Sequence, residues 1–127
     1  MTYIKIDIHS PFGQPPEKPL VWLGGIIRSP PFSNEARREA GFLLWMLQKG
    51  ELLGMPKSRP MPSIGKRCHE LRVRDIGHDW RIMYRIDPEA ILILDVFAKR
   101  TRQTPWSVIE VCQRRLQRYD SEQASGA

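Results

Sequence analysis

Three strand-like segments in close succession constrain the fold of this chain more than any other feature of its sequence. The segment 67–75 places Leu71 and Val73 on one face and charged residues on the other, as a half-buried strand does. The turn "IGHD" follows, then the segment 80–86, the turn "DPE" and the apolar segment 90–98. Because short turns join antiparallel neighbours, the sequence predicts a three-stranded antiparallel meander, and the apolar last strand is expected to be covered on both faces.

Helical patterns flank the meander. Residues 34–49 carry apolar side chains at helical spacing, directly after a candidate N-cap at Ser33 or Asn34. After the meander, the pair "TP" is typical of a helix start, and the apolar positions behind it predict a C-terminal helix that ends near Asp120. Helices packed against an antiparallel sheet indicate a small domain of the α+β class.

The N-terminal part is expected to add short strands to this sheet. Residues 3–9 alternate isoleucine with polar residues and predict an edge strand, and "LVWLGG" predicts a second apolar strand. Prolines make residues 10–19 a connector, and the proline-studded "MPKSRPMPSIGKR" after the first helix reads as a loop. We therefore expect an N-terminal extension over residues 1–17, one domain over 18–120 and a disordered tail over 121–127.

Composition narrows the classes of function. Twenty Lys and Arg against fourteen Asp and Glu give a formal net charge of +6, which favours a polyanionic partner such as nucleic acid or an acidic protein. No apolar run approaches the roughly 20 residues that cross a bilayer, and the pattern of a secretory signal is lacking, so we expect a cytoplasmic protein. Cys68 and Cys112 are expected to be buried free thiols, and no motif predicts a metal site or a cofactor.

Three arginines are expected to meet on one face of the meander. Arg72 and Arg74 share a face of their strand because side chains alternate along it, and Arg81 opens the neighbouring antiparallel strand. Like charges opposite each other are unfavourable. Such a patch persists either because water solvates it, with Glu70 as a local counter-ion, or because an anion normally sits among its members. Both interpretations stay open on the pattern alone.

Further cations leave the last strand of the meander. Lys99 and Arg100 follow that strand directly, and Arg102 lies in the same loop ahead of the C-terminal helix. Cations near the start of a helix are at the wrong end of its dipole, so a local stabilising role is disfavoured. Together with the arginine patch, these residues predict a phosphate-binding rim. Trp106 beside them is either an aromatic that stacks on a base or an anchor in the core.

Five stretches resemble the phage-derived, HigB-like branch of the RelE/ParE toxin superfamily: "KPLVWLGG", "EARREAGFLLWMLQKGE", "HELRVRD", "WRIMY" and "VFAKRTRQTP". They cover about residues 18–119, and the spacing of "ELR", "WRIMY" and "F-x-K-R-x-x-x-T-P" is their most specific part. The resemblance implies a compact domain in which helices pack on one face of an antiparallel sheet. It also implies a bacterial toxin and, in the RelE-like members, cleavage of mRNA on the ribosome without a metal.

The resemblance also assigns roles by position. Arg72, Arg81 and Arg100 match basic residues of the RelE-type active site, and Glu70 stands where some relatives use a carboxylate as base. Lys99 precedes the last of these arginines, and Trp106 lies near an aromatic that stacks on RNA. The expected catalytic residues are thus Arg72, Arg81, Arg100 and Glu70. The residues expected to bind RNA or its phosphates are Arg74, Lys99, Arg102, Trp106 and Tyr84.

Three functions remain open at this stage. The first is a toxin that cleaves translated mRNA, with the 2′-hydroxyl of the RNA attacking the scissile phosphate. The second is a ParE-like toxin that binds and poisons DNA gyrase without nuclease chemistry, and the third is a non-toxic nucleic-acid-binding phage remnant. Both kinds of toxin imply a cognate antitoxin, which in this branch is commonly a helix-turn-helix protein that would carry the complex to operator DNA.

Overall fold

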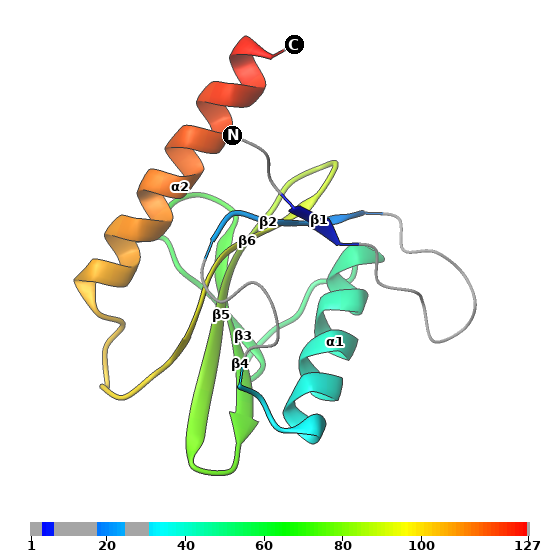
Figure 1. Ribbon diagram of the computed structural model, residues 1–127, viewed down its shortest axis with the longest axis vertical. Coiled ribbons are helices and arrows are strands. Elements are labelled where there is room, and N and C mark those ends of the chain that lie inside the picture. The colour runs from blue at the N-terminus through cyan, green and yellow to red at the C-terminus, as the bar shows by residue number, and fades with distance from the viewer. Residues whose placement is uncertain (1–3, 7–17, 25–30, 127) are drawn as a thin grey trace.

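A six-stranded β-sheet crosses the computed structural model, which describes residues 4–6, 18–24 and 31–126 of the chain. The order across the sheet is β1-β2-β6-β5-β4-β3. The strands are β1 (Ile4–Ile6), β2 (Leu20–Trp22), β3 (Ser58–Pro60), β4 (Cys68–Asp75), β5 (His78–Ile86) and β6 (Ile91–Ala98). Two helices, α1 (Asn34–Gln48) and α2 (Trp106–Ser125), lie on opposite sides of this sheet (Figure 1).

The predicted antiparallel meander consists of β4, β5 and β6, and its first two strands carry Glu70, Arg72 and Arg81. β4 and β5 pair along their whole length through a tight turn at Gly77, whose φ of 74° lies in the left-handed region that glycine adopts at little cost. β5 and β6 pair from Ile86↔Ile91 to Trp80↔Ala98. The meander, the two helices and the α+β class are confirmed.

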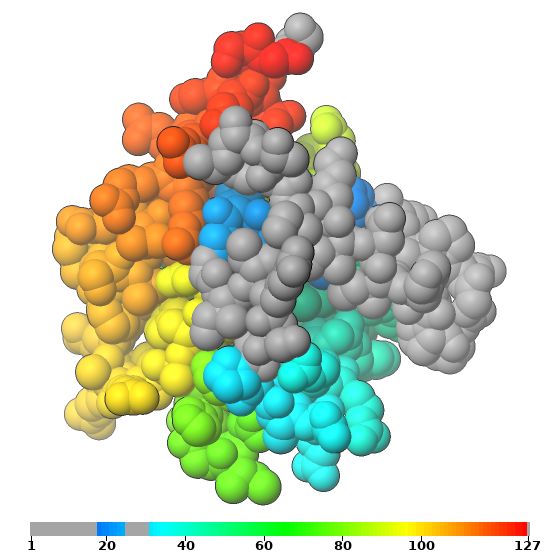
Figure 2. All heavy atoms as spheres, viewed as in Figure 1, coloured from blue at the N-terminus to red at the C-terminus, as the bar shows by residue number. Residues whose placement is uncertain are grey.

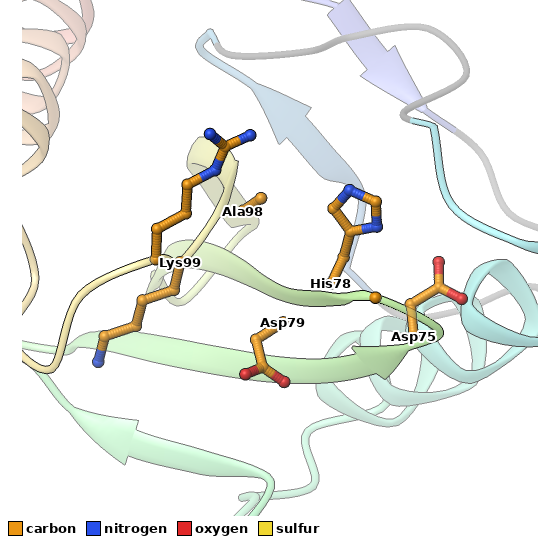
Figure 3. Close-up of a pocket in the computed structure, with 7 residues that line it drawn as sticks. Asp75, His78, Asp79, Ala98 and Lys99 are labelled. Carbon is orange, nitrogen blue, oxygen red and sulfur yellow. The ribbon is translucent and has the colours of Figure 1, made fainter.

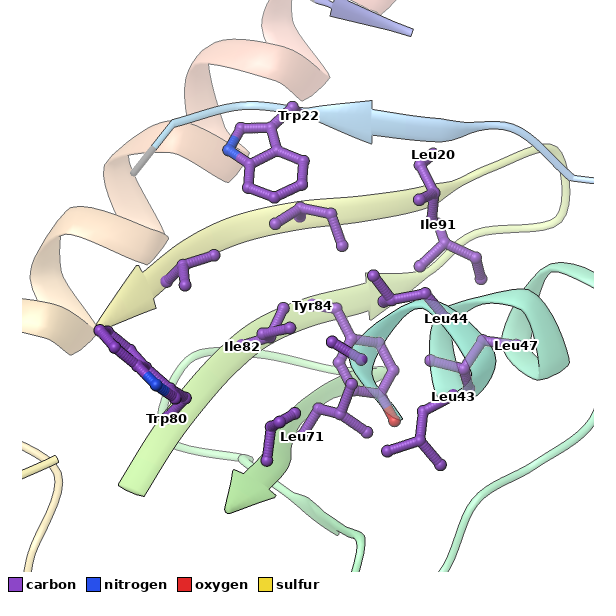
Figure 4. Packing of buried hydrophobic residues seen from close by; sticks show 14 of the residues in the cluster. Leu20, Trp22, Leu43, Leu44, Leu47, Leu71, Trp80, Ile82, Tyr84 and Ile91 are labelled. Carbon is purple, nitrogen blue, oxygen red and sulfur yellow. The ribbon is translucent and has the colours of Figure 1, made fainter. Parts of the chain in front are cut away.

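Each face of the sheet carries its own hydrophobic core. On one face, Leu44 and Leu47 of α1 pack with Leu71 and Ile82 of the meander (Figure 4). Burying one such side chain stabilises the fold by about 1.5–3 kcal/mol. On the other face, α2 presents a buried stripe to β5 and β6; this cluster contains Met83, Leu92, Leu94, Ile109, Cys112 and Leu116.

Residues 91–94 of β6 have no exposed surface because the strand contributes to both cores. A strand that is apolar on both faces needs a cover on each, and the two helices provide it. The expectation from the family resemblance that the helices share one face is therefore wrong. The sheet is also not antiparallel throughout, since β2 runs parallel to β6 over three residue pairs.

Asp75 joins the start of α1 to the β4–β5 hairpin. Its Oδ2 accepts hydrogen bonds from the backbone N–H of Ser33 at 2.9 Å and from Nε1 of Trp80 at 3.2 Å, and its Oδ1 accepts from the N–H of Ile76 at 2.8 Å. These bonds, the one from Ser33 foremost, lower the pKa of Asp75 to about 2. Ser33 is also the N-cap of α1, as predicted, because its Oγ accepts from the N–H of Ala36.

Arg115 of α2 binds an irregularity in β6. The register between β5 and β6 skips Leu94, which forms a bulge. Nη1 of Arg115 donates to the carbonyl oxygen of Leu94 at 2.6 Å and lies 3.3 Å from Oδ1 of Asp95. Gly24 leaves room for this guanidinium group, since a Cβ at position 24 would lie 2.3 Å from its Cζ.

Two segments are more regular than the sequence suggested. The predicted loop after α1 contains β3, a three-residue strand that pairs with β4. The predicted tail is helical as far as Ser125, because Arg118 and Glu122 form an i,i+4 ion pair and the Ser125 hydroxyl bonds the carbonyl of Ser121. Of the predicted strand 3–9, only residues 4–6 are described, as β1; the rest of the N-terminal extension and most of the connector lie outside the described residues.

Both cysteines are buried free thiols, as predicted. Burial raises the pKa of Cys68 to about 11 and that of Cys112 to about 12. Neither helix of the described residues combines the length and the apolar character that crossing a bilayer requires.

Candidate functional site

A buried carboxylate organises the basic end of the sheet. Glu70 of β4 has no exposed surface, and its Oε1 lies 3.1 Å from Nε of Arg59 and 3.5 Å from Nε of both Arg72 and Arg81. Its Oε2 accepts a hydrogen bond of 3.2 Å from Oγ1 of Thr104. We call these five residues the arginine cluster. Three guanidinium groups around one carboxylate leave an excess of positive charge.

Strand register brings the cluster together. Arg59 of β3 pairs with Glu70, and Arg72 pairs with Arg81 in β5. Opposite residues in an antiparallel pair have Cβ atoms about 4.5–5.5 Å apart, close enough for the charges to interact directly. Two guanidinium groups in that arrangement repel each other, so the carboxylate between them is what makes the pairing tolerable.

Burial leaves the cations of the cluster short of partners. The side chain of Arg81 is only 12% exposed, and its burial lowers its pKa while the charge of Glu70 opposes that shift. Burial likewise lowers the pKa of nearby Lys99, where Glu70 acts in the opposite direction and Arg81 in the same one. The Nε atoms of Arg72 and Arg81 are buried and have no hydrogen-bond partner among the described residues. Both Nε atoms face the Glu70 carboxylate at 3.5 Å and are closed to solvent, so an anion would bind these residues through their other guanidinium nitrogens.

An open groove of about 440 Å³ lies beside the cluster, and we call it the basic groove. Its lining holds four cations against one carboxylate, which makes its potential positive. Guanidinium forks match phosphate oxygens in geometry as well as in charge. The lining residues are Pro56, Lys57, Arg72, Arg74, Asp79 and Arg81.

A second hollow, of about 450 Å³, adjoins the first at Asp79, which lines both. It lies where the end of β6 passes the β4–β5 turn, and Figure 2 shows these two segments, yellow and green, side by side at the surface. We call it the hairpin hollow. Its lining residues, drawn in Figure 3, are Asp75, Gly77, His78, Asp79, Ala98, Lys99 and Arg100.

Three of the four expected catalytic residues come together in the structure. Arg72, Arg81 and Glu70 belong to the arginine cluster, whereas Arg100 is exposed and lines the hairpin hollow instead. β6 ends at Ala98, so the alternation that orders a strand no longer fixes where residue 100 points. Glu70 itself has no surface that a substrate hydroxyl could reach. Its geometry favours the positioning of cations over the removal of a proton.

The residues expected to bind RNA have mixed outcomes. Arg74 lines the basic groove, and Arg102 is exposed in the loop after β6. Trp106 is 62% exposed, with its Nε1 donating to Glu110, so it is not an anchor in the core. The prediction for Tyr84 is wrong. Its side chain is fully buried on the face of the sheet toward α1, where its hydroxyl bonds the hydroxyl of Ser58.

Two members of the cluster escaped the sequence interpretation. Arg59 sits in a strand of three residues that ends in proline, which is too short to show a periodic pattern. Thr104 reads as a helix cap, yet the N-cap of α2 is Pro105 and the Thr104 hydroxyl turns to Glu70. The contact between Thr104 and Glu70 is indicated in the sequence only by the joint presence of the "ELR" and "T-P" motifs.

Comparison with known proteins assigns the chain to a family. The family described as Phage derived protein Gp49-like (DUF891) matches residues 31–117, which include α1, the whole meander and every member of the arginine cluster. No curated protein and no solved structure matches the chain. Because the family match spans well over half of the sequence, the protein belongs to the phage-derived Gp49-like family, which is known for toxins of toxin–antitoxin systems.

Proposed function

We propose that this protein is the toxin of a type II toxin–antitoxin pair and that it cleaves mRNA on the ribosome. The observation that carries the proposal is the convergence of Arg59, Arg72 and Arg81 on one buried carboxylate beside a positively charged groove. Membership of the Gp49-like family supports the role as a toxin. The HigB-like sequence pattern supports RNA as the substrate.

The proposed reaction needs no group beyond the RNA and the protein side chains. The 2′-hydroxyl oxygen forms a bond to the adjacent phosphorus, the bond from phosphorus to the 5′ oxygen breaks, and one proton moves from the first oxygen to the second. The products are a 2′,3′-cyclic phosphate and a 5′-hydroxyl. The protein must hold these atoms in line and stabilise the negative charge that builds up on the phosphorane.

Arg72 and Arg81 suit the stabilising role. They keep their charge at any physiological pH, and both line the basic groove while Glu70 holds their Nε ends in place. Removing one such preorganised donor typically lowers the rate by about 10²- to 10³-fold. Lys99 lines the adjoining hairpin hollow, where its charge suits a contact with a backbone phosphate of the RNA.

The experiment is a translation reaction on a defined mRNA, with cleavage mapped by primer extension. We expect new 5′ ends within the translated region with the wild type and about 10²-fold fewer with Arg81→Ala. Arg38→Ala is the matched control, since Arg38 is an exposed arginine of α1 on the opposite side of the sheet, and it should cleave as the wild type does. Growth arrest without new 5′ ends, or inhibition of gyrase that survives in Arg81→Ala, would overturn the nuclease proposal in favour of a ParE-like toxin.

A cognate antitoxin is part of the proposal. The excess positive charge of the basic groove suits an acidic segment of such a partner. Co-expression with the neighbouring small gene should restore growth, and the two proteins should co-purify. A chain that arrests growth and is relieved by no neighbouring gene product would contradict this pairing.

A further inference from the structure

The hairpin hollow differs from the basic groove in its charge. In the basic groove four cations face one carboxylate, whereas in the hairpin hollow Lys99 and Arg100 face Asp75 and Asp79. Two charges of each sign leave no net attraction for a phosphate. Such a lining suits a neutral group that carries hydrogen-bond donors and acceptors.

An imidazole ring forms one wall of this hollow. His78 is exposed and stacks on Trp80, with ring centroids 5.2 Å apart and an angle of 16° between the planes. Its Nδ1 lies 3.3 Å from the carbonyl oxygen of Ile76, which fixes the ring about its side-chain bonds. Figure 3 shows His78 and Asp79 on opposite sides of β5.

The support under that ring is rigid. Trp80 is buried, packs against Phe32 at 4.8 Å between ring centroids, and donates its Nε1 hydrogen to Asp75. Since one face of the imidazole covers Trp80 and the residue is nevertheless exposed, its other face is open. A flat ring that is held from behind and open in front is what a stacking nucleobase requires.

A free guanidinium group completes the hollow. Arg100 makes no hydrogen bond or ion pair with any residue of the described ranges, while both oxygens of Asp75 are occupied by donors of the fold. Guanidinium groups bind the polar edges of bases and also stack on their faces. Arg100 thus faces the hollow with its full donor capacity unused.

We propose that the hairpin hollow is a nucleobase-binding subsite, in which one base of a single-stranded RNA stacks on His78 while Arg100 binds the polar edge of that base. The proposal rests on the proposed function in one respect: the RNA is the chain whose phosphates lie in the basic groove. His78 and Arg81 lie three residues apart in β5 and point to opposite faces of the sheet, so the RNA strand would pass from the basic groove to the stacking ring around the hairpin end of β5, where Asp79 lines both hollows.

The test compares binding of two polyanions by the full-length protein. Fluorescence anisotropy measures the affinity for a labelled single-stranded oligoribonucleotide, and competition with inorganic polyphosphate of matched charge measures the affinity for phosphate alone. Stacking on an aromatic side chain is worth a factor of about 5 to 100 in affinity per base, and we expect the low end for the small imidazole ring. His78→Ala should therefore weaken RNA binding by about 5- to 10-fold and leave polyphosphate binding unchanged, whereas His78→Phe should restore it.

A second histidine of the chain supplies the matched control. His69 stacks on Tyr84 with centroids 5.3 Å apart and an angle of 18°, and its Nδ1 lies 3.1 Å from the carbonyl oxygen of Arg67. It lies at the other end of β4 and lines neither hollow. His69→Ala removes the same kind of ring pair, so it should leave the affinity for RNA unchanged.

Three results would overturn the subsite. The first is equal binding of RNA and polyphosphate by the wild type, the second is equal loss with His78→Ala and His69→Ala, and the third is failure of His78→Phe to recover RNA binding. The proposed cleavage is judged separately in the translation reaction. If RNA binding depends on His78 but no new 5′ ends appear, the subsite stands and the nuclease proposal fails. If new 5′ ends appear but RNA binding does not depend on His78, the nuclease proposal stands and the subsite fails.

Discussion

Glu70→Gln is the sharpest test of how the arginine cluster is held together. The change removes one negative charge, nearly preserves the volume, and keeps an oxygen that can accept from Thr104. In the wild type, the Nε atoms of three guanidinium groups lie 3.1–3.5 Å from a carboxylate oxygen of Glu70. In the variant these three cations face a neutral amide instead. The variant therefore separates the charge of the side chain from its shape.

The size of the effect follows from the burial of the partners. Breaking a buried ion pair costs about 3–5 kcal/mol when one charge is left behind. Arg59 and Arg72 are 35% and 29% exposed and water can screen them, while Arg81 is 12% exposed and cannot be resolvated so easily. We therefore expect a loss of about 3 kcal/mol in the free energy of unfolding. For a domain of this length that corresponds to a melting temperature lower by about 10 °C.

The assay is urea denaturation followed by circular dichroism at low salt and again with added sulfate. Sulfate both screens the guanidinium groups and can occupy the place of the lost charge, so part of the loss should return. Glu39→Gln is the control, since Glu39 pairs with Lys57 at the surface, where both side chains are 31–53% exposed and the pair is worth about 0–1 kcal/mol. If Glu70→Gln loses no more than Glu39→Gln, or if sulfate restores nothing, the carboxylate does not organise the cluster and our reasoning about it fails.

Three further predictions test separate contacts. Thr104→Val removes the hydroxyl that binds Glu70, so it should speed hydrogen exchange of the loop after β6 and lower single-turnover cleavage at saturating protein, and Thr104→Ser should show the wild-type values of both. Thr101→Val is the control: the Thr101 hydroxyl bonds only within that loop, so its loss should change neither quantity. Gly24→Ala should lower stability by about 1–3 kcal/mol because the guanidinium of Arg115 must leave the carbonyl of the β6 bulge, and a double-mutant cycle with Arg115→Ala should show that the two losses are not additive. The stability of the wild type should fall between about pH 4 and about pH 2, because the folded pKa of Asp75 of about 2 lies below its unfolded value and the folded state resists protonation there. Melting curves of Asp75→Asn against pH should show a smaller fall; part of it remains because the hydrogen bonds from Arg85 also lower the pKa of Asp120.

Much of the fold could be predicted because local patterns specify it. Alternation along 67–75, short turns and one doubly apolar strand lead to the meander, and the Ser33 cap leads to α1. The side of the sheet that α2 covers depends on the path of the loop after β6, which no periodicity records. Even so, the apolar residues on both faces of β6 indicated that two covers were needed.

The candidate site shows the same division. Arg72 and Arg81 could be placed together from strand pairing, because their positions follow from register. Strand parity also held evidence against Tyr84: it lies three residues from Arg81 in the same strand, so the two side chains point to opposite faces. Arg59 could not be found, because its strand is too short to show a pattern. Arg100 could not be placed, because it follows the last residue of β6.

The parallel pairing of β2 with β6 determines where this chain can be shortened. Among the residues that the structure describes, β2 alone covers that edge of β6, through bonds such as the one from the N–H of Leu23 to the carbonyl of Ile93 at 2.8 Å. The family match begins at residue 31, so a fragment trimmed to it would make an eight-residue apolar strand the outermost one. Unpaired apolar edges recruit further copies of themselves. The outer strands β1 and β3 have three residues each, and β3 ends in Pro60, which has no amide hydrogen to donate. A trimmed fragment would replace the short strand β1 at one edge of the sheet with the long apolar strand β6, and we expect it to aggregate.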